Sequence, residues 1–176
     1  VEARLAAPAE RVGYLSNLER LPDRELEYRK VSISGRFDHQ RETLVEALTE
    51  RGPGYWVMTP LVGAGGTILV NRGFVPPERR APASRAAGLV EGPVTVTGLV
   101  RLSEPGGRFL RANRPAEERW YSRDVEAIAE ARGLGDIAGL FLDADRTSNP
   151  GGLPVGGLTV VRFRNTHLVY ALTWFA

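Results

Sequence analysis

Alternation of apolar and polar side chains constrains the fold of this chain more than any other feature of its sequence. Val94, Val96, Val100 and Leu102 occupy alternate positions, as they do in a strand that buries one face. Residues 31–37 show the same period of two. Residues 55–62 and 67–70, joined by the glycine-rich segment 63–66, are typical of a hairpin. We expect the remaining strands at 42–49, 139–143 and 158–164.

Helices are scarce by comparison, and this decides the fold class. One clear helix is expected, with Val125, Ile128 and Ala129 as its apolar stripe, Ser122 as its cap and Gly133 at its end. Parallel sheets need a helix between successive strands, so turns between strands favour antiparallel pairing. We therefore predict an α+β fold that is mainly antiparallel β. We expect a curled sheet or a barrel-like soluble domain with one or two short helices.

Composition removes several function classes. The chain has no cysteine, which excludes disulfides, thiolate metal sites and cysteine nucleophiles. Lys30 is the only lysine among 23 basic residues. The formal net charge of +2 is too small to indicate a nucleic-acid-binding surface, so no nucleic-acid partner is expected.

The string Phe141-Leu142-Asp143-Ala144-Asp145-Arg146-Thr147 has the form of the nucleophile loop in aspartate-dependent phosphotransferases. Such enzymes need a downstream lysine, and Lys30 lies far upstream. We interpret the string as the end of a strand that runs into an Asx-type turn. With no other credible catalytic set, the chain is predicted not to be an enzyme.

Two histidines are present. We interpret His39 as an exposed turn residue.

A terminal helix that Asn165 would cap places three residues on one face: His167, Tyr170 and Trp174. A histidine near a helix N-terminus stays neutral, as an axial haem ligand must be. Alternatively, the three residues belong to the aromatic belt where a helix enters a membrane, and the apolar segment 167–176 is either a core helix or the start of a membrane span.

Several strings together resemble the Surfeit locus protein 1 (Shy) family of cytochrome c oxidase assembly factors. They lie in order along the chain and run from about residue 26 to the end. They are residues 27–31 and 35–39, residues 68–76 (I-L-V-N-R-G-F-V-P), Asn113-Arg114-Pro115 with Trp120, Tyr121 and Asp124, the glycines of 150–157, and residues 165–174 (N-T-H-L-V-Y-A-L-T-W).

The resemblance implies a domain between two transmembrane helices. Residues 1–166 would form the extracytoplasmic domain, and 167–176 would be the truncated start of the second helix. The expected location is the bacterial inner membrane with the domain in the periplasm, or the intermembrane-space side of the mitochondrial inner membrane. The implied function is delivery or placement of haem a in oxidase subunit I. The alternative is a scaffold that holds no haem and docks subunit I or haem a synthase.

The resemblance also implies site residues. His167 would ligate the haem iron, the only metal expected, with Tyr170 and Trp174 packing the ring. Haem a should bind weakly or not at all here, because most of the membrane cradle is missing.

A second group of residues, Asn71, Arg72, Gly73, Asn113 and Trp120, is predicted to form a partner surface or to hold the fold. Gly73 would allow a bend or bulge, and Pro76 would end the pairing. Arg72 would pair with a carboxylate of a partner or with a haem propionate.

Overall fold

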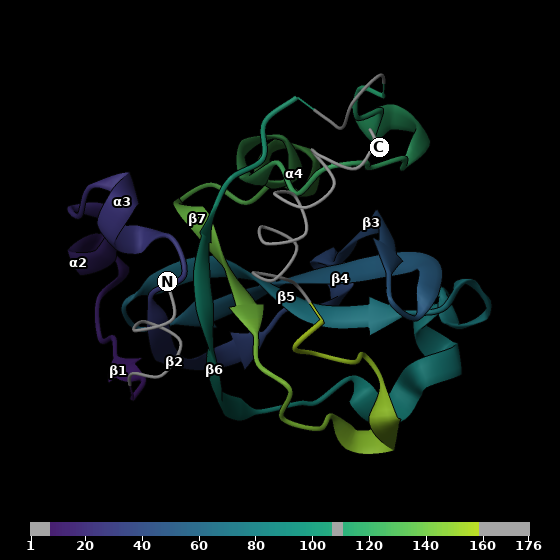
Figure 1. The fold of residues 1–176 in the computed structure, drawn as a ribbon, viewed down its shortest axis with the longest axis horizontal. Coiled ribbons are helices and arrows are strands. Elements are labelled where there is room, and N and C mark those ends of the chain that lie inside the picture. Colours follow the sequence, from purple (N-terminus) through teal and green to yellow (C-terminus); the bar gives the residue numbers. More distant parts are fainter. Residues whose placement is uncertain (1–7, 107–110, 159–176) are drawn as a thin grey trace, which may run out of the picture.

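The computed structural model describes residues 8–106 and 111–158. These residues form seven strands and three α-helices, with short 3-10 segments between them (Figure 1). The strands are β1 (Glu10–Arg11), β2 (Lys30–Phe37), β3 (Thr43–Thr49), β4 (Gly52–Gly63), β5 (Gly66–Val75), β6 (Pro93–Leu102) and β7 (Ile137–Ala144). The helices are α2 (Leu15–Glu19), α3 (Asp23–Leu26) and α4 (Val125–Arg132). The 3-10 segments are η1 (His39–Arg41), η2 (Pro77–Arg79), η3 (Pro82–Gly88), η4 (Pro115–Glu117) and η5 (Pro150–Gly152).

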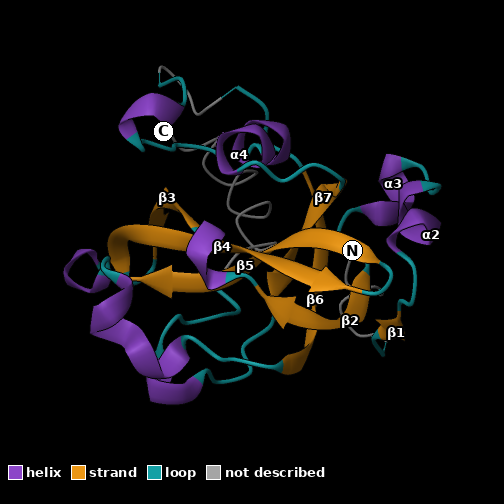
Figure 2. Cartoon of the chain, turned by 180° about the vertical axis from the view of Figure 1, so that it is seen from behind, coloured by secondary structure: helices purple, strands orange, loops and turns teal. Residues whose placement is uncertain are grey.

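The sheet closes on itself. Its strand order is β1-β2-β6-β7-β5-β4-β3, and β2 also pairs with β4 through Arg36↔Val62 and Phe37↔Leu61. The strands β2, β6, β7, β5 and β4 therefore form a closed barrel, while β3 continues along the first half of β4. The predicted mainly β, barrel-like fold with few short helices is confirmed, and the helices lie outside the strands (Figure 2).

Two strand pairs depart from the antiparallel prediction. β5 pairs with β7 in parallel, and the two-residue β1 pairs with β2 in parallel. The chain between β6 and β7 crosses the outside of the barrel through α4, so β7 is inserted between β5 and β6 instead of following a hairpin turn. The other described pairings are antiparallel.

Alternate residues of β5 and β7 contribute to two apolar cores. Ile68, Val70, Leu140 and Leu142 point into the barrel with Val31. On the outer face, a second core lies under α4. It contains Leu69, Phe141, Met58, Trp120, Val45, Val125 and Ile128. Both faces of these strands are therefore covered.

The helix α4 confirms the apolar stripe but corrects its cap. Val125, Ile128 and Ala129 are buried, and Gly133 ends the helix with a φ of 68°. The cap is Asp124, whose Oδ1 accepts the Ala127 N–H at 3.2 Å, and not Ser122. The Ser122 hydroxyl instead donates to the Glu104 carbonyl at 2.8 Å, since Ser122 lies in a bend before the helix begins.

The strand predicted at 94–102 is β6, with Val94, Val96, Val100 and Leu102 against the barrel core. Residues 159–164 of the strand expected at 158–164, and the cap Asn165, lie outside the described residues. Within residues 8–106 and 111–158, no helix has the length and apolar character that a membrane crossing requires.

Candidate functional site

The segment Asn71-Arg72-Gly73 lies near the end of β5 and forms a β-bulge. Trp56 pairs with Phe74 and Met58 pairs with Asn71, so Arg72 and Gly73 together oppose a single residue of β4. The φ of Gly73 is 130°, and a Cβ atom there would lie 2.3 Å from the Val155 carbonyl oxygen. The bulge predicted at Gly73 is confirmed, and pairing with β4 ends at Val75, directly before Pro76.

Asn71 bonds on both sides of this bulge. Its Nδ2 donates to Asp143 Oδ1 at 3.0 Å, and its Oδ1 accepts the Gly73 N–H at 3.0 Å. The residue is 2% exposed. Both ends of the amide are therefore used inside the protein.

The side chain of Arg72 lies on the face of β5 opposite to that of Asn71, toward one end of the barrel. Its Nη1 donates to the Gly88 carbonyl at 2.7 Å and its Nη2 to Asn149 Oδ1 at 2.9 Å. The guanidinium lies over the Phe37 ring, 4.6 Å from its centroid. The side chain is buried, and burial lowers its pKa to about 10 despite the opposing effect of Glu42.

A second buried arginine lies near Arg72. Arg85 in η3 is 5% exposed, and its Nη2 pairs with Glu42 Oε2 at 2.8 Å. We call Arg72, Arg85 and Glu42 the Arg72 cluster. It holds two guanidinium groups and one carboxylate.

A cavity of about 290 Å³ opens beside Arg72. Phe37, Val94 and Val96 give it apolar walls. Asn149 and Asp145 from the chain after β7 add polar groups. It is a site where an apolar wall meets a buried cation.

A separate buried ion network surrounds Asp143, which is 3% exposed. Arg101 Nη1 donates to its Oδ2 at 2.8 Å, and Arg123 Nη1 donates to its Oδ1 at 3.2 Å. The outer partners are Glu27, bound by Arg101 at 2.7 Å, and Glu104, bound by Arg123 at 2.7 Å. With Asn71 these residues form what we call the Asp143 cluster.

Charge balance in the Asp143 cluster sets the protonation of its members. Burial alone would lower the pKa of Arg101, but Asp143 and Glu27 outweigh it and the pKa is raised. Burial would likewise raise the pKa of Glu104. The hydrogen bonds and charge of Arg123 outweigh that effect, so the pKa lies below its usual range. Both shifts favour the charged forms of Arg101 and Glu104, as expected in a structural ion network and not in a poised acid–base pair.

Asn113 and Trp120 belong to the covering segment that precedes α4. Asn113 Oδ1 accepts the N–H groups of Tyr121 and Ser122 at 2.6 and 3.1 Å. Trp120 is 1% exposed in the core under α4, and its carbonyl accepts the Glu46 N–H of β3 at 2.9 Å. Asn113 therefore holds the two ends of this segment together, and Trp120 attaches the segment to the sheet.

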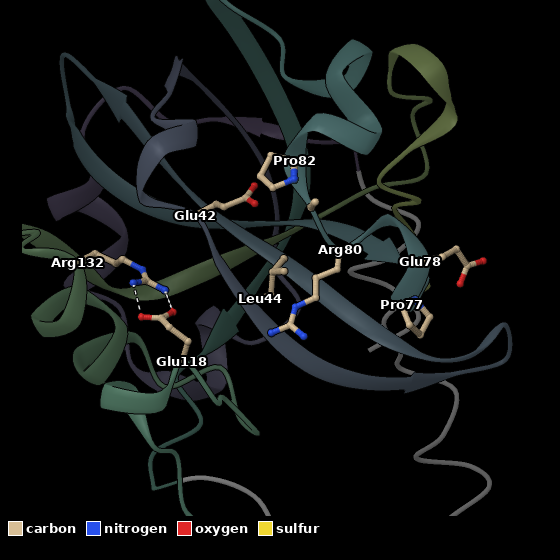
Figure 3. Close-up of a pocket in the computed structure, with 9 residues that line it drawn as sticks. Glu42, Leu44, Pro77, Glu78, Arg80, Pro82, Glu118 and Arg132 are labelled. Carbon is tan, nitrogen blue, oxygen red and sulfur yellow. Dashed lines mark hydrogen bonds and ion pairs between the residues drawn. The ribbon is translucent and has the colours of Figure 1, made fainter.

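A second cavity, of about 530 Å³, lies on the outside of the barrel. Three segments line it: the start of β3, the chain from η2 to η3, and η4 with the end of α4 (Figure 3). Arg132 and Glu118 form an ion pair along one side, while Leu44 and Pro82 supply apolar surface. Both charge signs line it, so its lining favours no charged ligand.

His39 corrects the sequence prediction. The residue is half-buried in η1, and its Nε2 lies 2.7 Å from the Val90 carbonyl oxygen. Its Nδ1 is buried without a hydrogen-bond partner in the described structure. The turn packs against Phe37, whose ring centroid is 5.6 Å from that of His39, and this contact covers the imidazole.

The predicted haem residues His167, Tyr170 and Trp174 lie outside the described residues. His39 is the one histidine among the described residues, and Met58 is the one methionine of the chain. Both types of side chain can ligate haem iron. The Nε2 of His39 is held by Val90, and Met58 is 0% exposed in the core. Neither side chain is therefore placed as an accessible axial ligand, and the described residues contain no group of three His, Asp or Glu side chains that could hold a metal ion.

Comparison with known proteins decides the family. The model of the SURF1 family matches residues 1–176. Surfeit locus protein 1 of Mus musculus is 41% identical over 169 residues, which cover 86% of this chain and 54% of that protein. The chain belongs to the SURF1 family.

Other SURF1 relatives agree. The Homo sapiens protein is 39% identical over 170 residues, covering 86% of this chain and 56% of its own length. The Gallus gallus protein is 42% identical over 171 residues, covering 86% and 54%. The chain thus spans about half the length of the curated relatives that it matches.

Two of the strings that carry the SURF1 resemblance meet in the fold. Residues 68–76 meet the Pro150–Gly157 segment through the Phe74↔Val155 bridge and the Arg72–Asn149 bond. Sequence reasoning missed Arg85, Arg101, Arg123 and Glu104, which complete the two clusters. The surplus of arginine over lysine was the available signal, since guanidinium groups suit buried bidentate pairing.

Proposed function

We propose that this chain is the extramembrane domain of a cytochrome c oxidase assembly factor that acts in placing haem a in subunit I. Membership of the SURF1 family supports this proposal, together with the string Asn165-Thr166-His167 at the place where the family resemblance puts the haem ligand. The protein would act as a carrier and not as an enzyme.

In this proposal, His167 binds the haem iron, and Tyr170 and Trp174 pack against the ring. Bound haem a supplies the redox-active group that the oxidase needs. This chain would contribute a neutral imidazole, because the sequence predicts His167 at the N-terminal end of a helix, where the helix dipole disfavours protonation. The barrel would dock subunit I or haem a synthase, and the membrane would hold the flanking segments.

One observation favours a second candidate, a scaffold that holds no haem. The amides of Asn71 and Asn113 bond inside the protein, Trp120 is buried, and His39 Nε2 lies 2.7 Å from the Val90 carbonyl oxygen. A domain so occupied would contribute to assembly by binding oxidase subunit I or haem a synthase through its outer surface.

The test is a haem a titration, followed by the Soret band, on the longest natural form of the protein in detergent. We expect saturable one-to-one binding that His167→Ala abolishes. His39→Gln serves as the matched control and should leave binding unchanged. Equal weak binding by the wild type and His167→Ala would reject the carrier and leave the scaffold.

A further inference from the structure

The Arg72 cluster carries an uncompensated positive charge. Arg72 and Arg85 are both buried, and Glu42 is the carboxylate of the cluster, with its side chain 10% exposed. Glu42 pairs directly with Arg85, whereas Arg72 bonds, within residues 8–106 and 111–158, only to the neutral oxygens of Gly88 and Asn149. Buried charges are normally paired, so a cation held by neutral acceptors needs an explanation.

Arg72 also retains unused donors. A guanidinium has five N–H groups, and the bonds to Gly88 and Asn149 use two of them. The others have no hydrogen-bond partner among the described residues. Arg72 lines the 290 Å³ cavity, so a ligand that enters this cavity can reach the guanidinium.

We propose that this cavity binds a small organic carboxylate, whose carboxylate group pairs with Arg72 and whose apolar tail lies against Val94 and Val96. The volume is at the lower end of the range for ligand sites, which limits the ligand to a small molecule. A guanidinium fork matches a carboxylate in shape and charge. The apolar walls distinguish this ligand from an inorganic anion, which would gain nothing from them.

Asp145 provides a way to test the charge argument. Its carboxylate also lines the cavity and repels an anion there. Its Oδ1 accepts the Thr147 N–H at 3.0 Å, a bond that an asparagine oxygen can keep. Asp145→Asn therefore removes the repulsion while preserving the turn.

The experiment is a titration of the ¹⁵N-labelled chain with hexanoate, followed by NMR. We expect saturable shifts at the amides of Thr97 and Asn149, with a Kd of about 1 mM or lower. Hexan-1-ol has a comparable tail without the charge, and inorganic phosphate has charge without the tail. Each should bind at least about tenfold more weakly. Equal binding by hexan-1-ol or by phosphate would overturn the proposal, as would shifts spread over the surface.

Two variants complete the test. Asp145→Asn should lower the Kd for hexanoate about two- to fivefold, in line with the strength of partly exposed charge pairs. Arg72→Lys should weaken binding more than about tenfold, because an ammonium cannot replace the fork. Should Arg72→Lys fail to fold, the Asp145→Asn result still decides: an unchanged or weaker affinity would contradict a carboxylate site at Arg72.

Discussion

Asn71 and Asp143 lie directly opposite each other on the parallel strands β5 and β7, and the amide of Asn71 donates to the carboxylate of Asp143 at 3.0 Å. The same amide accepts the Gly73 N–H. One side chain therefore connects the Asp143 cluster to the bulge that turns Arg72 toward the barrel end.

We expect Asn71→Asp to lower the free energy of unfolding by about 1–3 kcal/mol, because it replaces a buried donor to Asp143 with a second carboxylate. The bond to the Gly73 N–H is retained, so the loss reports on the contact with Asp143. Urea unfolding at pH 7 measures the change. Asn17→Asp, at an exposed position in α2, is the control and should stay within about 0.5 kcal/mol. Equal small effects of the two substitutions would show that the Asn71–Asp143 bond does not stabilise the fold.

Asp143→Asn should lower the free energy of unfolding by about 3 kcal/mol. Arg101 and Arg123 lose the buried carboxylate that they share, and each keeps one other acid, Glu27 or Glu104. The matched control is Asp145→Asn, two residues along the chain, which keeps the bond to the Thr147 N–H. Denaturant midpoints of the two variants give the comparison. If Asp143→Asn melted like Asp145→Asn, the ion network would have no structural role.

Gly73→Ala tests the bulge. We expect a loss of about 1–3 kcal/mol from backbone strain at a φ of 130°, with a further loss from the contact with Val155. Gly135→Ala is the control, since a Cβ there meets nothing within 4 Å and the residue has no positive φ. Thermal melts followed by circular dichroism would separate them, and a wild-type melting temperature for Gly73→Ala would contradict the strain.

Glu104 should make stability depend on acid pH. Its pKa in the folded protein lies below the usual value of 4.5, so the unfolded chain takes up the proton first as the pH falls. The stabilisation is complete above about pH 4.5 and is lost as the pH drops through the folded pKa. The free energy of unfolding should therefore fall less between pH 6 and pH 3 in Glu104→Gln than in the wild type. The variant has about one fewer group that takes up a proton on unfolding.

The same pH series on Glu130→Gln, at an exposed position of α4, provides the comparison. A steeper pH dependence for Glu104→Gln than for the wild type would mean that the sign of the pKa shift at Glu104 is wrong.

Patterns local in the sequence predicted much of this fold. The period of two identified β6, and turn residues identified the β4–β5 hairpin, because these signals depend on neighbouring positions. The parallel pairing of β5 with β7 depends on where the chain crosses the barrel, which no local pattern records. The Asx turn predicted in the 141–147 string is present at Asp145. No local pattern in the sequence predicts that Asp143 is buried.

The candidate site shows the same limit. Asn71, Arg72 and Gly73 were singled out as a string, yet the residues outside it that accept hydrogen bonds from the Asn71 and Arg72 side chains lie 16 to 77 residues away. The sequence does not distinguish Arg101 and Arg123 from surface arginines. Only the fold brings β6 and the segment before α4 to Asp143. The haem residues His167, Tyr170 and Trp174 remain a prediction.

The sharing of β5 and β7 between the two apolar cores has a consequence for unfolding. Ile68 and Val70 belong to the barrel interior while Leu69 between them belongs to the core under α4, and Leu140, Phe141 and Leu142 alternate in the same way. If β5 or β7 separated from one core, its apolar side chains in the other core would also become exposed to solvent. The barrel and its α4 cover should therefore unfold cooperatively, in a single transition that probes in either core report at the same denaturant concentration.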